Sequence, residues 1–169
     1  MLDVLRFRFG RPIAISASDY ALGRNKIPKE QAMFRFSTTS NKRRAGADPR
    51  LIQISDRALE ISVVDFGIPE HGGIRTAEEQ YKLFLDGKSR ADGTNHLSYH
   101  QSGKALDFYA FVDGKASWYP GHLAMVASAF LQASAELGYR LTWGGLWLPV
   151  KTTSGVPHGW DAGHIQLED

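Results

Sequence analysis

Two stretches of sequence decide the fold of this chain: Ser98-Tyr99-His100-Gln101-Ser102-Gly103-Lys104-Ala105-Leu106-Asp107 and, far downstream, Trp160-Asp161-Ala162-Gly163-His164-Ile165-Gln166. Together they supply two imidazoles and two carboxylates. Two histidines and one carboxylate suit a catalytic zinc ion that keeps its fourth coordination position open, and a second carboxylate beside them can act as a base. The pattern predicts that the two stretches meet in the folded protein.

The alternation of residues in each stretch predicts a β-strand. In the first strand, predicted from Ala105 to Val112, Asp107 shares a face with bulky apolar side chains, so its carboxylate needs a cation or a hydrogen-bond donor beside it. The second strand is predicted from Gly163 to Leu167 and carries His164. If the two strands are neighbours, Asp107 and His164 can share one ion.

The bare spacing leaves two interpretations of these residues open. In one, three side chains hold a metal ion: His100, Asp107 and His164. Asp161 then accepts a proton from the water that attacks the substrate, and Gly103 permits the sharp turn that the first two ligands require. In the other, the histidines are hydrogen-bonded structural residues, which is the common role of a lone histidine.

Helical patterns lie on both sides of the first stretch. Apolar spacing and end signals predict three helices, at residues 49–65, 76–87 and 121–137, the second of which begins with Thr76 and Glu79 at the spacing of a capping box. A further short strand is predicted from Arg140 to Trp143. Few strands and separated helices predict an α+β fold with a small, mostly antiparallel sheet flanked by about three helices.

The composition limits the class of protein and of site. The 169 residues suffice for one domain with a buried core, and we assign residues 46–169 to a catalytic core and residues 1–45 to an irregular, basic elaboration of it. The chain has no cysteine, which excludes disulfides and thiolate zinc sites. A transition metal must then be held by His, Asp or Glu.

Charge is distributed unevenly along the chain. Residues 1–50 contain 11 Lys and Arg against four Asp and Glu, although the net charge of the whole chain is only +2. Such a patch favours anionic partners or is a solvated face, and we rank nucleic-acid binding low because Trp and Tyr are scarce there. The first residues lack the apolar run of a signal peptide, and no segment approaches the roughly 20 apolar residues of a membrane span, so we expect no membrane insertion.

The stretch from Ser98 to Asp107 resembles the Ser-x-His-x-x-Gly-x-Ala-x-Asp signature of the LAS zinc peptidases. That group joins D-alanyl-D-alanine carboxypeptidases and dipeptidases, phage L-alanyl-D-glutamate endolysins and the hedgehog signalling domain. Asp161-Ala162-Gly163-His164 is similar to the second signature of the group. Two further segments are also similar to family segments: Gly73-Ile74-Arg75-Thr76 with Gln80, and the turn Trp143-Gly144-Gly145.

The resemblance spans roughly residues 50 to 167, leaves out residues 1–45, and implies the hedgehog/DD-peptidase fold. It implies Zn²⁺ held by three ligands, with a general base and a catalytic cation that binds a substrate carboxylate or the developing oxyanion. The ligands are His100, Asp107 and His164, the base is Asp161, and the cation is Arg75. We add four candidate substrate contacts: Gln80, Ser98, His158 and Trp160.

The activity that the resemblance implies is that of a zinc metallopeptidase acting on cell-wall peptides. We expect a phage endolysin that cleaves the L-alanyl-D-glutamate bond of the peptidoglycan stem peptide, acts as a monomer, and leaves the host cytoplasm through a holin. One alternative is a D-alanyl-D-alanine carboxypeptidase or dipeptidase, which uses the same zinc and base. Another is a zinc-bearing binding module without catalysis.

Overall fold

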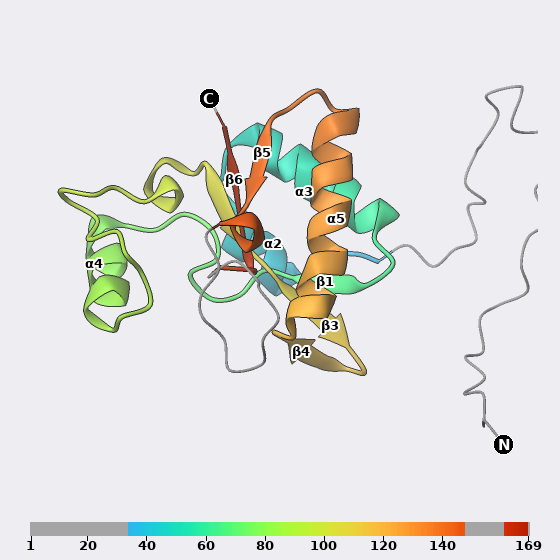
Figure 1. The fold of residues 1–169 in the computed structure, drawn as a ribbon, viewed down its shortest axis with the longest axis horizontal. Coiled ribbons are helices and arrows are strands. Elements are labelled where there is room, and N and C mark those ends of the chain that lie inside the picture. The colour runs from blue at the N-terminus through green and yellow to red at the C-terminus, as the bar shows by residue number, and fades with distance from the viewer. Residues whose placement is uncertain (1–33, 148–160, 169) are drawn as a thin grey trace, which may run out of the picture. The chain divides into compact units, whose positions relative to one another are not determined.

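A computed structural model describes residues 34–147 and 161–168 of the chain. The chain divides into two units, Met1–Ala32 and Met33–Asp169, and all described residues lie in the second. The described part contains four α-helices, two short 3-10 helices and six β-strands, which confirms the α+β class with one helix more than expected (Figure 1). Within this part, no helix has the length and apolar character needed to span a bilayer.

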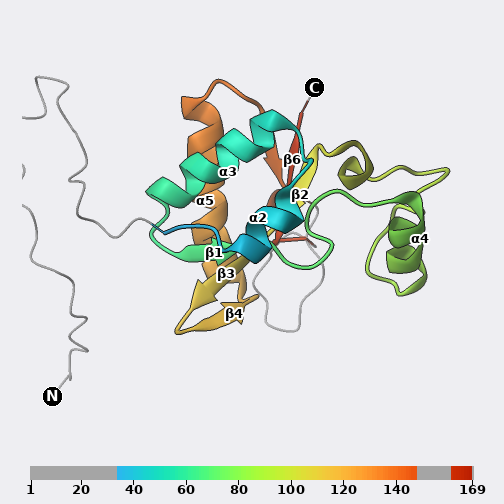
Figure 2. The ribbon, with the colours of Figure 1, turned by 180° about the vertical axis from the view of Figure 1, so that it is seen from behind.

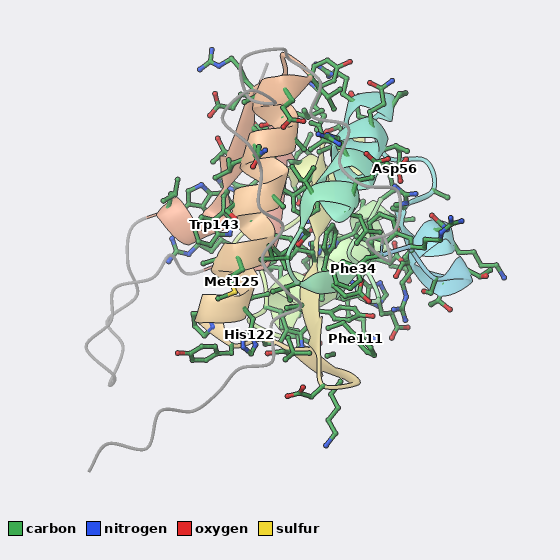
Figure 3. The ribbon with its side chains drawn as sticks, turned by 90° about the vertical axis from the view of Figure 1, so that its right-hand side faces the viewer. Phe34, Asp56, Phe111, His122, Met125 and Trp143 are labelled. Atoms are coloured by element: carbon green, nitrogen blue, oxygen red, sulfur yellow. The ribbon has the colours of Figure 1, made fainter. Side chains whose placement is uncertain are left out.

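Helices α3 (Pro49–Ile61) and α5 (Pro120–Glu136) pack against each other and provide much of the hydrophobic core (Figures 1 and 2). Their apolar residues recur at helical spacing, so each helix has one buried stripe. The fully buried ones are Leu51, Ile54, Ala58, Val126, Ala127, Phe130 and Ala133. The opposite side of α5 faces solvent, where Met125 is 49% exposed (Figure 3).

One antiparallel sheet joins the two stretches of sequence that carry the candidate site. Its strand order is β2 (Ala105–Asp107), β6 (His164–Leu167) and β5 (Leu141–Trp143). The register sets Asp107 directly opposite His164. The prediction that these two residues lie on neighbouring strands is therefore confirmed.

A second antiparallel sheet contains β1 (Asp65–Gly67), β3 (Tyr109–Val112) and β4 (Lys115–Ser117). The single strand predicted over residues 105–112 is thus divided between the two sheets at Phe108. The ring of Phe108 is fully buried. The strand is divided at Phe108 because this ring is buried in the core at the point where the chain passes from one sheet to the other.

One helix end and one additional helix differ clearly from the sequence predictions. The helix predicted to reach Asp65 ends at Ile61, because the main chain is already extended at Ser62 and Asp65 begins β1. Residues 38–44, expected to be irregular, form helix α2 (Thr38–Arg44). Helix α2 is held in place by a polar contact: the guanidinium of the buried Arg44 donates to Ser55 Oγ at 2.7 Å. Because this contact needs no apolar stripe, the sequence of α2 shows little apolar periodicity.

Helix α4 (Ala77–Leu85) extends away from the rest of the described fold (Figure 1). Its start is the predicted capping box, in which Thr76 Oγ1 accepts from Glu79 N at 3.1 Å and Glu79 Oε2 accepts from Thr76 N at 2.8 Å. Its only buried residue is Gln80. Three large apolar side chains of α4 are 40% to 66% exposed: Tyr81, Phe84 and Leu85. We call α4 together with the following residues 86–98 the α4 arm.

Candidate active site

The three candidate ligands come from adjoining elements of the chain. The 3-10 helix η1 (Tyr99–Ser102) presents His100, and Gly103 ends that helix in the left-handed region, at φ 69°. Strand β2 follows and ends at Asp107, which the antiparallel register sets opposite His164. The turn predicted at Gly103 is confirmed, and it allows ligands on a helix and on a strand to face one point.

The three ligand atoms lie at separations typical of atoms around one ion. His100 Nε2 lies 3.2 Å from Asp107 Oδ1 and 3.2 Å from His164 Nδ1. Asp107 Oδ1 lies 2.9 Å from His164 Nδ1. Tetrahedral coordination with bonds of about 2.0 to 2.1 Å places ligand atoms about 3.3 Å apart. These side chains could therefore hold one metal ion with little rearrangement.

In each imidazole, the nitrogen that faces away from the other ligands (the outer nitrogen) contacts a protein oxygen, and this contact determines which nitrogen carries the proton. His100 Nδ1 lies 2.8 Å from Gly73 O, and His164 Nε2 lies 3.2 Å from Gln166 Oε1. Because these oxygens only accept hydrogen bonds, both outer nitrogens are protonated and, in the neutral rings, both inner nitrogens offer a lone pair. Two lone pairs and a carboxylate oxygen that face one another repel unless a cation lies among them. The chemistry of the donor set thus fits a metal ion.

Burial and mutual attraction shift the pKa values of the ligands. Burial lowers the pKa of His100, although Asp107 pulls it upward. Burial opposes ionisation of Asp107, yet the charges and hydrogen bonds of His100 and His164 hold its pKa below the ordinary range. Burial also opposes protonation of His164, but the hydrogen bond and charge of Asp107 raise its pKa overall. Asp107 is therefore ionised at neutral pH, and a metal ion must compete with a proton for His164.

Two consecutive glycines support the ligand-bearing elements. Gly72 O accepts from Asp107 N at 2.7 Å, and Gly73 O holds the imidazole of His100. A Cβ at position 73 would lie 1.9 Å from the carbonyl oxygen of Arg43. Only glycine fits there, because the conflict is with backbone atoms that are held in helix α2.

Arg75 lies against the carboxylate of Asp107. Its Nη2 forms an ion pair with Asp107 Oδ2, which leaves Oδ1 to face the histidines. Its Nε donates to His71 O at 2.6 Å, and its Nη1 donates to Gln80 Oε1 at 3.4 Å. Each of the three guanidinium nitrogens therefore donates to a protein oxygen, and the guanidinium orients the candidate ligand.

Asp161 is half-buried beside the ligand group. Its main-chain oxygen accepts from His164 N at 3.2 Å. Gly144, in the Trp-Gly-Gly turn, packs so closely that a Cβ there would lie 2.4 Å from the same oxygen. Burial raises the pKa of Asp161 to about 6, and the negative charge of Asp107 acts in the same direction. The carboxylate of Asp161 is thus a stronger base than that of an ordinary aspartate.

A cavity of about 610 Å³ opens onto the ligand group. All three candidate ligands line it, as do Arg75 and Asp161. Two tryptophans, Trp118 and Trp147, also line the cavity, and the ring centroid of Trp147 lies 5.2 Å from that of His164. The α4 arm supplies a further part of the lining, from Leu83, Lys88, Ser89, Arg90, Ala91, Leu97 and Ser98. Its size and mixed lining suit a peptide.

Two predicted substrate contacts have hydrogen bonds within the protein. Ser98 lines the cavity, and its Oγ caps η1 by accepting from His100 N at 3.3 Å. Gln80 is fully buried and is not among the described residues that line the cavity. Its Nε2 donates to Ser89 Oγ at 2.7 Å and to Ala91 O at 2.9 Å. Gln80 therefore ties the loop of the α4 arm to its helix.

The other two predicted substrate contacts, His158 and Trp160, lie outside the described residues. The structure also brings to the site residues that sequence reasoning missed: Gly73, Lys88, Arg90 and Trp118. Gly73 had a detectable signal, because it is the first residue of the segment Gly73-Ile74-Arg75-Thr76 that resembles the family, but no role was assigned to it. Lys88, Arg90 and Trp118 had none, since a single loop or strand-end residue has no periodicity and no motif.

Comparison with known proteins gives consistent matches. The family model of the phage L-alanyl-D-glutamate peptidase matches residues 32–168. The L-alanyl-D-glutamate peptidase of Escherichia phage T5 is 34% identical over 141 residues, covering 79% of this chain and 98% of the phage protein. The crystal structure of the Serratia marcescens L-Ala D-Glu endopeptidase ChiX superposes with a TM-score of 0.65 at 30% identity, covering 83% of this chain and 94% of ChiX.

The family match begins well before residue 50, where the resemblance in the sequence was expected to begin. It includes helix α2, so part of the segment that we left out of the resemblance belongs to it. The length of the match, the two relatives and the meeting of both signatures at one cavity all agree. This chain belongs to the phage L-alanyl-D-glutamate peptidase family.

Proposed function

We propose that this chain is a zinc-dependent endolysin that hydrolyses the L-alanyl-D-glutamate bond of the peptidoglycan stem peptide. The observation that carries the proposal is the approach of His100 Nε2, Asp107 Oδ1 and His164 Nδ1 to within 3.2 Å of one another in a cavity that Asp161 also lines. The family model and both relatives are named for peptidases of this bond, which supports the choice of substrate.

The donor set supports zinc as the resident ion. Two imidazole nitrogens and one carboxylate oxygen at tetrahedral spacing are a common set for catalytic zinc. His100, Asp107 and His164 would hold the ion, while Gly73 and Gln166 keep the imidazoles in the tautomers that bind it. Bound zinc would lower the pKa of its water to about 7 and polarise the substrate carbonyl.

Asp161 is the proposed general base. It accepts a proton from the attacking water as the new C–O bond forms on the alanyl carbonyl carbon. It returns a proton to the glutamyl nitrogen as the C–N bond breaks, so the products are a free carboxyl on alanine and a free amine on glutamate. A pKa of about 6 suits a group that must both accept and donate a proton near neutral pH.

The remaining predicted site residues have proposed roles of three kinds: stabilising the oxyanion, contacting the substrate and holding a loop. Arg75 lines the cavity and carries its positive charge beside Asp107, and we assign it to stabilising the developing oxyanion through an N–H that Asp107 does not use. Ser98 lines the cavity and is kept as a substrate contact. Gln80 acts through the loop that it holds. His158 and Trp160 stay predicted substrate contacts.

Two alternatives use the same residues. A D-alanyl-D-alanine carboxypeptidase or dipeptidase would share the metal and the base, and the names of the matched family and relatives speak against it. A non-catalytic binding module would not need a base, and the position of Asp161 on the same cavity as the ligands speaks against that.

Digestion of purified muropeptides followed by mass spectrometry tests the proposed function. Cleavage of the L-alanyl-D-glutamate bond separates the whole stem after its first residue, whereas a carboxypeptidase releases only the terminal alanine. We expect the first product set, its loss after treatment with a chelator, and its recovery with zinc. Release of terminal alanine alone, or products that persist without metal, would contradict the proposal.

Three further expectations belong to the same proposal. The match to phage peptidases supports action on a host wall, and we keep the expectation that the protein leaves the cytoplasm through a holin. We keep the expectation that residues 1–169 form one functional domain, in which the basic elaboration is limited to the residues before the family match at residue 32. We also expect a monomer, which sedimentation of the purified protein checks.

A further inference from the structure

The substrate that the proposed function assigns has a distinctive charge next to the bond that breaks. A glutamyl residue has two carboxyl groups, and in bacterial stem peptides the chain continues through the γ-carboxyl. The α-carboxylate is therefore free, and it is attached to the same carbon as the nitrogen that leaves. A site that places this nitrogen near its general base must also accommodate an anion there.

Two cationic side chains line the cavity next to Asp161. Asp161 lines a second recess of about 310 Å³ beside the main cavity, and the other described residues that line it come from the α4 arm: Gly87, Lys88, Ser89 and Arg90. Lys88 and Arg90 line the main cavity as well. The side chain that is proposed to protonate the leaving nitrogen thus shares its recess with an ammonium and a guanidinium.

Their charges also compensate for that of Asp161. An anionic substrate group next to an ionised aspartate is repelled, and two cations in the same recess offset the repulsion. Lys88 donates to Asp86 at 3.3 Å, and its side chain is 66% exposed. Such an exposed pair is weak and exchanges partners at little cost.

Arg75 is less suited to this carboxylate, although it lines the main cavity. Its three nitrogens already donate to Asp107, His71 O and Gln80 Oε1. Turning the guanidinium toward a substrate carboxylate would release Asp107, a proposed metal ligand. Arg75 is also not among the described residues that line the recess beside Asp161.

We propose that Lys88 and Arg90 bind the free α-carboxylate of the D-glutamyl residue and so select substrates in which this group is charged. The inference rests on the proposed function, because it assumes the L-alanyl-D-glutamate bond and Asp161 as the base. Arginine can grip a carboxylate with two parallel hydrogen bonds, and lysine adds a point charge. The α4 arm is then the part of the fold that reads the substrate on the leaving-group side.

Two synthetic stem peptides that differ only at the D-glutamyl α-position test the inference, one with the carboxylate and one with the uncharged amide. We expect the wild-type enzyme to cleave the carboxylate peptide with a kcat/KM about tenfold higher or more. In the double variant Lys88→Gln/Arg90→Gln, kcat/KM should fall about tenfold on the carboxylate peptide and change little on the amide, so the preference disappears. Lys88→Arg should retain it.

A matched control removes the same charge elsewhere on the arm. Lys82 lies on α4, is exposed and is not among the described residues that line either cavity, so Lys82→Gln should keep the wild-type preference. A wild-type enzyme that cleaves both peptides equally, or a double variant that keeps the preference, overturns the inference while the proposed function stands. Failure of the wild-type enzyme to cut either peptide at this bond contradicts the proposed function itself.

Discussion

The ligand-bearing sheet and the α4 arm line the same cavity, but they are held in different ways. In the sheet, Leu106 and Ile165 lie opposite each other next to two of the ligands, and both are fully buried. In the arm, Leu85 is 66% exposed, and the buried contact is the polar side chain of Gln80. The side with the candidate metal ligands is thus fixed by core packing, whereas the proposed substrate-binding side depends on a few hydrogen bonds.

This difference separates two requirements of the enzyme. Ligand atoms must stay within a fraction of an ångström of their positions, which a packed sheet provides. The side of the cavity that receives a polymeric substrate benefits from elements that can change position, and such elements have few buried apolar contacts. Substitutions in the sheet should therefore affect the metal and the stability, and substitutions in the arm should affect substrate binding.

The largest expected effect follows from removing a ligand. His164→Ala should lose the bound metal and all detectable peptidase activity, because two ligands are left and the negative charge of Asp107 loses a partner. Metal analysis of the purified variant together with the muropeptide assay checks this. Activity near the wild-type level in the metal-free variant would show that the three residues are not a catalytic metal site.

Removing the base should separate metal binding from catalysis. Asp161→Asn should keep the metal, since Asp161 is not one of the three candidate ligands, and should lose about a hundredfold to ten-thousandfold in kcat. Metal content and kcat are measured on the same sample. A near-native rate would mean that Asp161 is not the base, and a loss of metal would assign it to the coordination sphere.

The packing difference itself is tested with two leucines. Leu106→Ala, in β2, should lower the free energy of unfolding by about 2 to 5 kcal/mol, because the side chain is fully buried. Leu85→Ala, on α4, should change it by less than about 0.5 kcal/mol, since that side chain is mostly exposed. Urea denaturation measures both. Equal losses would show that the arm is packed as firmly as the sheet.

Removing the buried amide of Gln80, the polar connection of the arm, should lower the free energy of unfolding by an amount between those of the two leucine substitutions. Gln80→Leu removes the hydrogen bonds to Ser89, Ala91 and Arg75 and should cost about 1 to 3 kcal/mol. We expect KM for the stem peptide to rise while metal content stays the same. The exposed Gln132 on α5 serves as a control, because Gln132→Leu removes only a surface contact with Glu136. An unchanged KM in Gln80→Leu would separate the arm from substrate binding.

The last prediction concerns the dependence of kcat/KM on pH, which requires no substitution. The base must be ionised, and burial raises the pKa of Asp161 to about 6, so kcat/KM should fall about tenfold per pH unit below that value. A bound cation lowers the pKa of a nearby carboxyl, so the acidic limb should lie at pH 6 or below. A limb centred above pH 7 with metal present would point to another group.

The sequence predicted those parts of the molecule that have a repeating or local signal. The capping box at Thr76, the buried stripe of α3 and the left-handed turn at Gly103 follow from short-range rules, and the structure confirms them. The neighbouring positions of Asp107 and His164 followed from alternation in two strands and were also confirmed.

What the sequence did not reveal depends on long-range polar contacts. Helix α2 docks through Arg44, which donates to Asn41 and Ser55 and pairs with Asp56, so no apolar stripe marked it. Likewise, no local sequence pattern indicated that Lys88 and Arg90 share a recess with Asp161, because the two cations lie far from Asp161 in the chain and meet it only in the folded structure.

Strands β2 and β6 pair through only three residue positions, and the last of these joins Asp107 with His164. Sliding one strand by a single residue would send His164 to the opposite face and scatter the donor atoms. An ion held between segments 57 residues apart in the chain would act as a removable cross-link that rewards the correct alignment. The melting temperature should consequently climb with the concentration of free zinc, even for a sample that never meets its substrate.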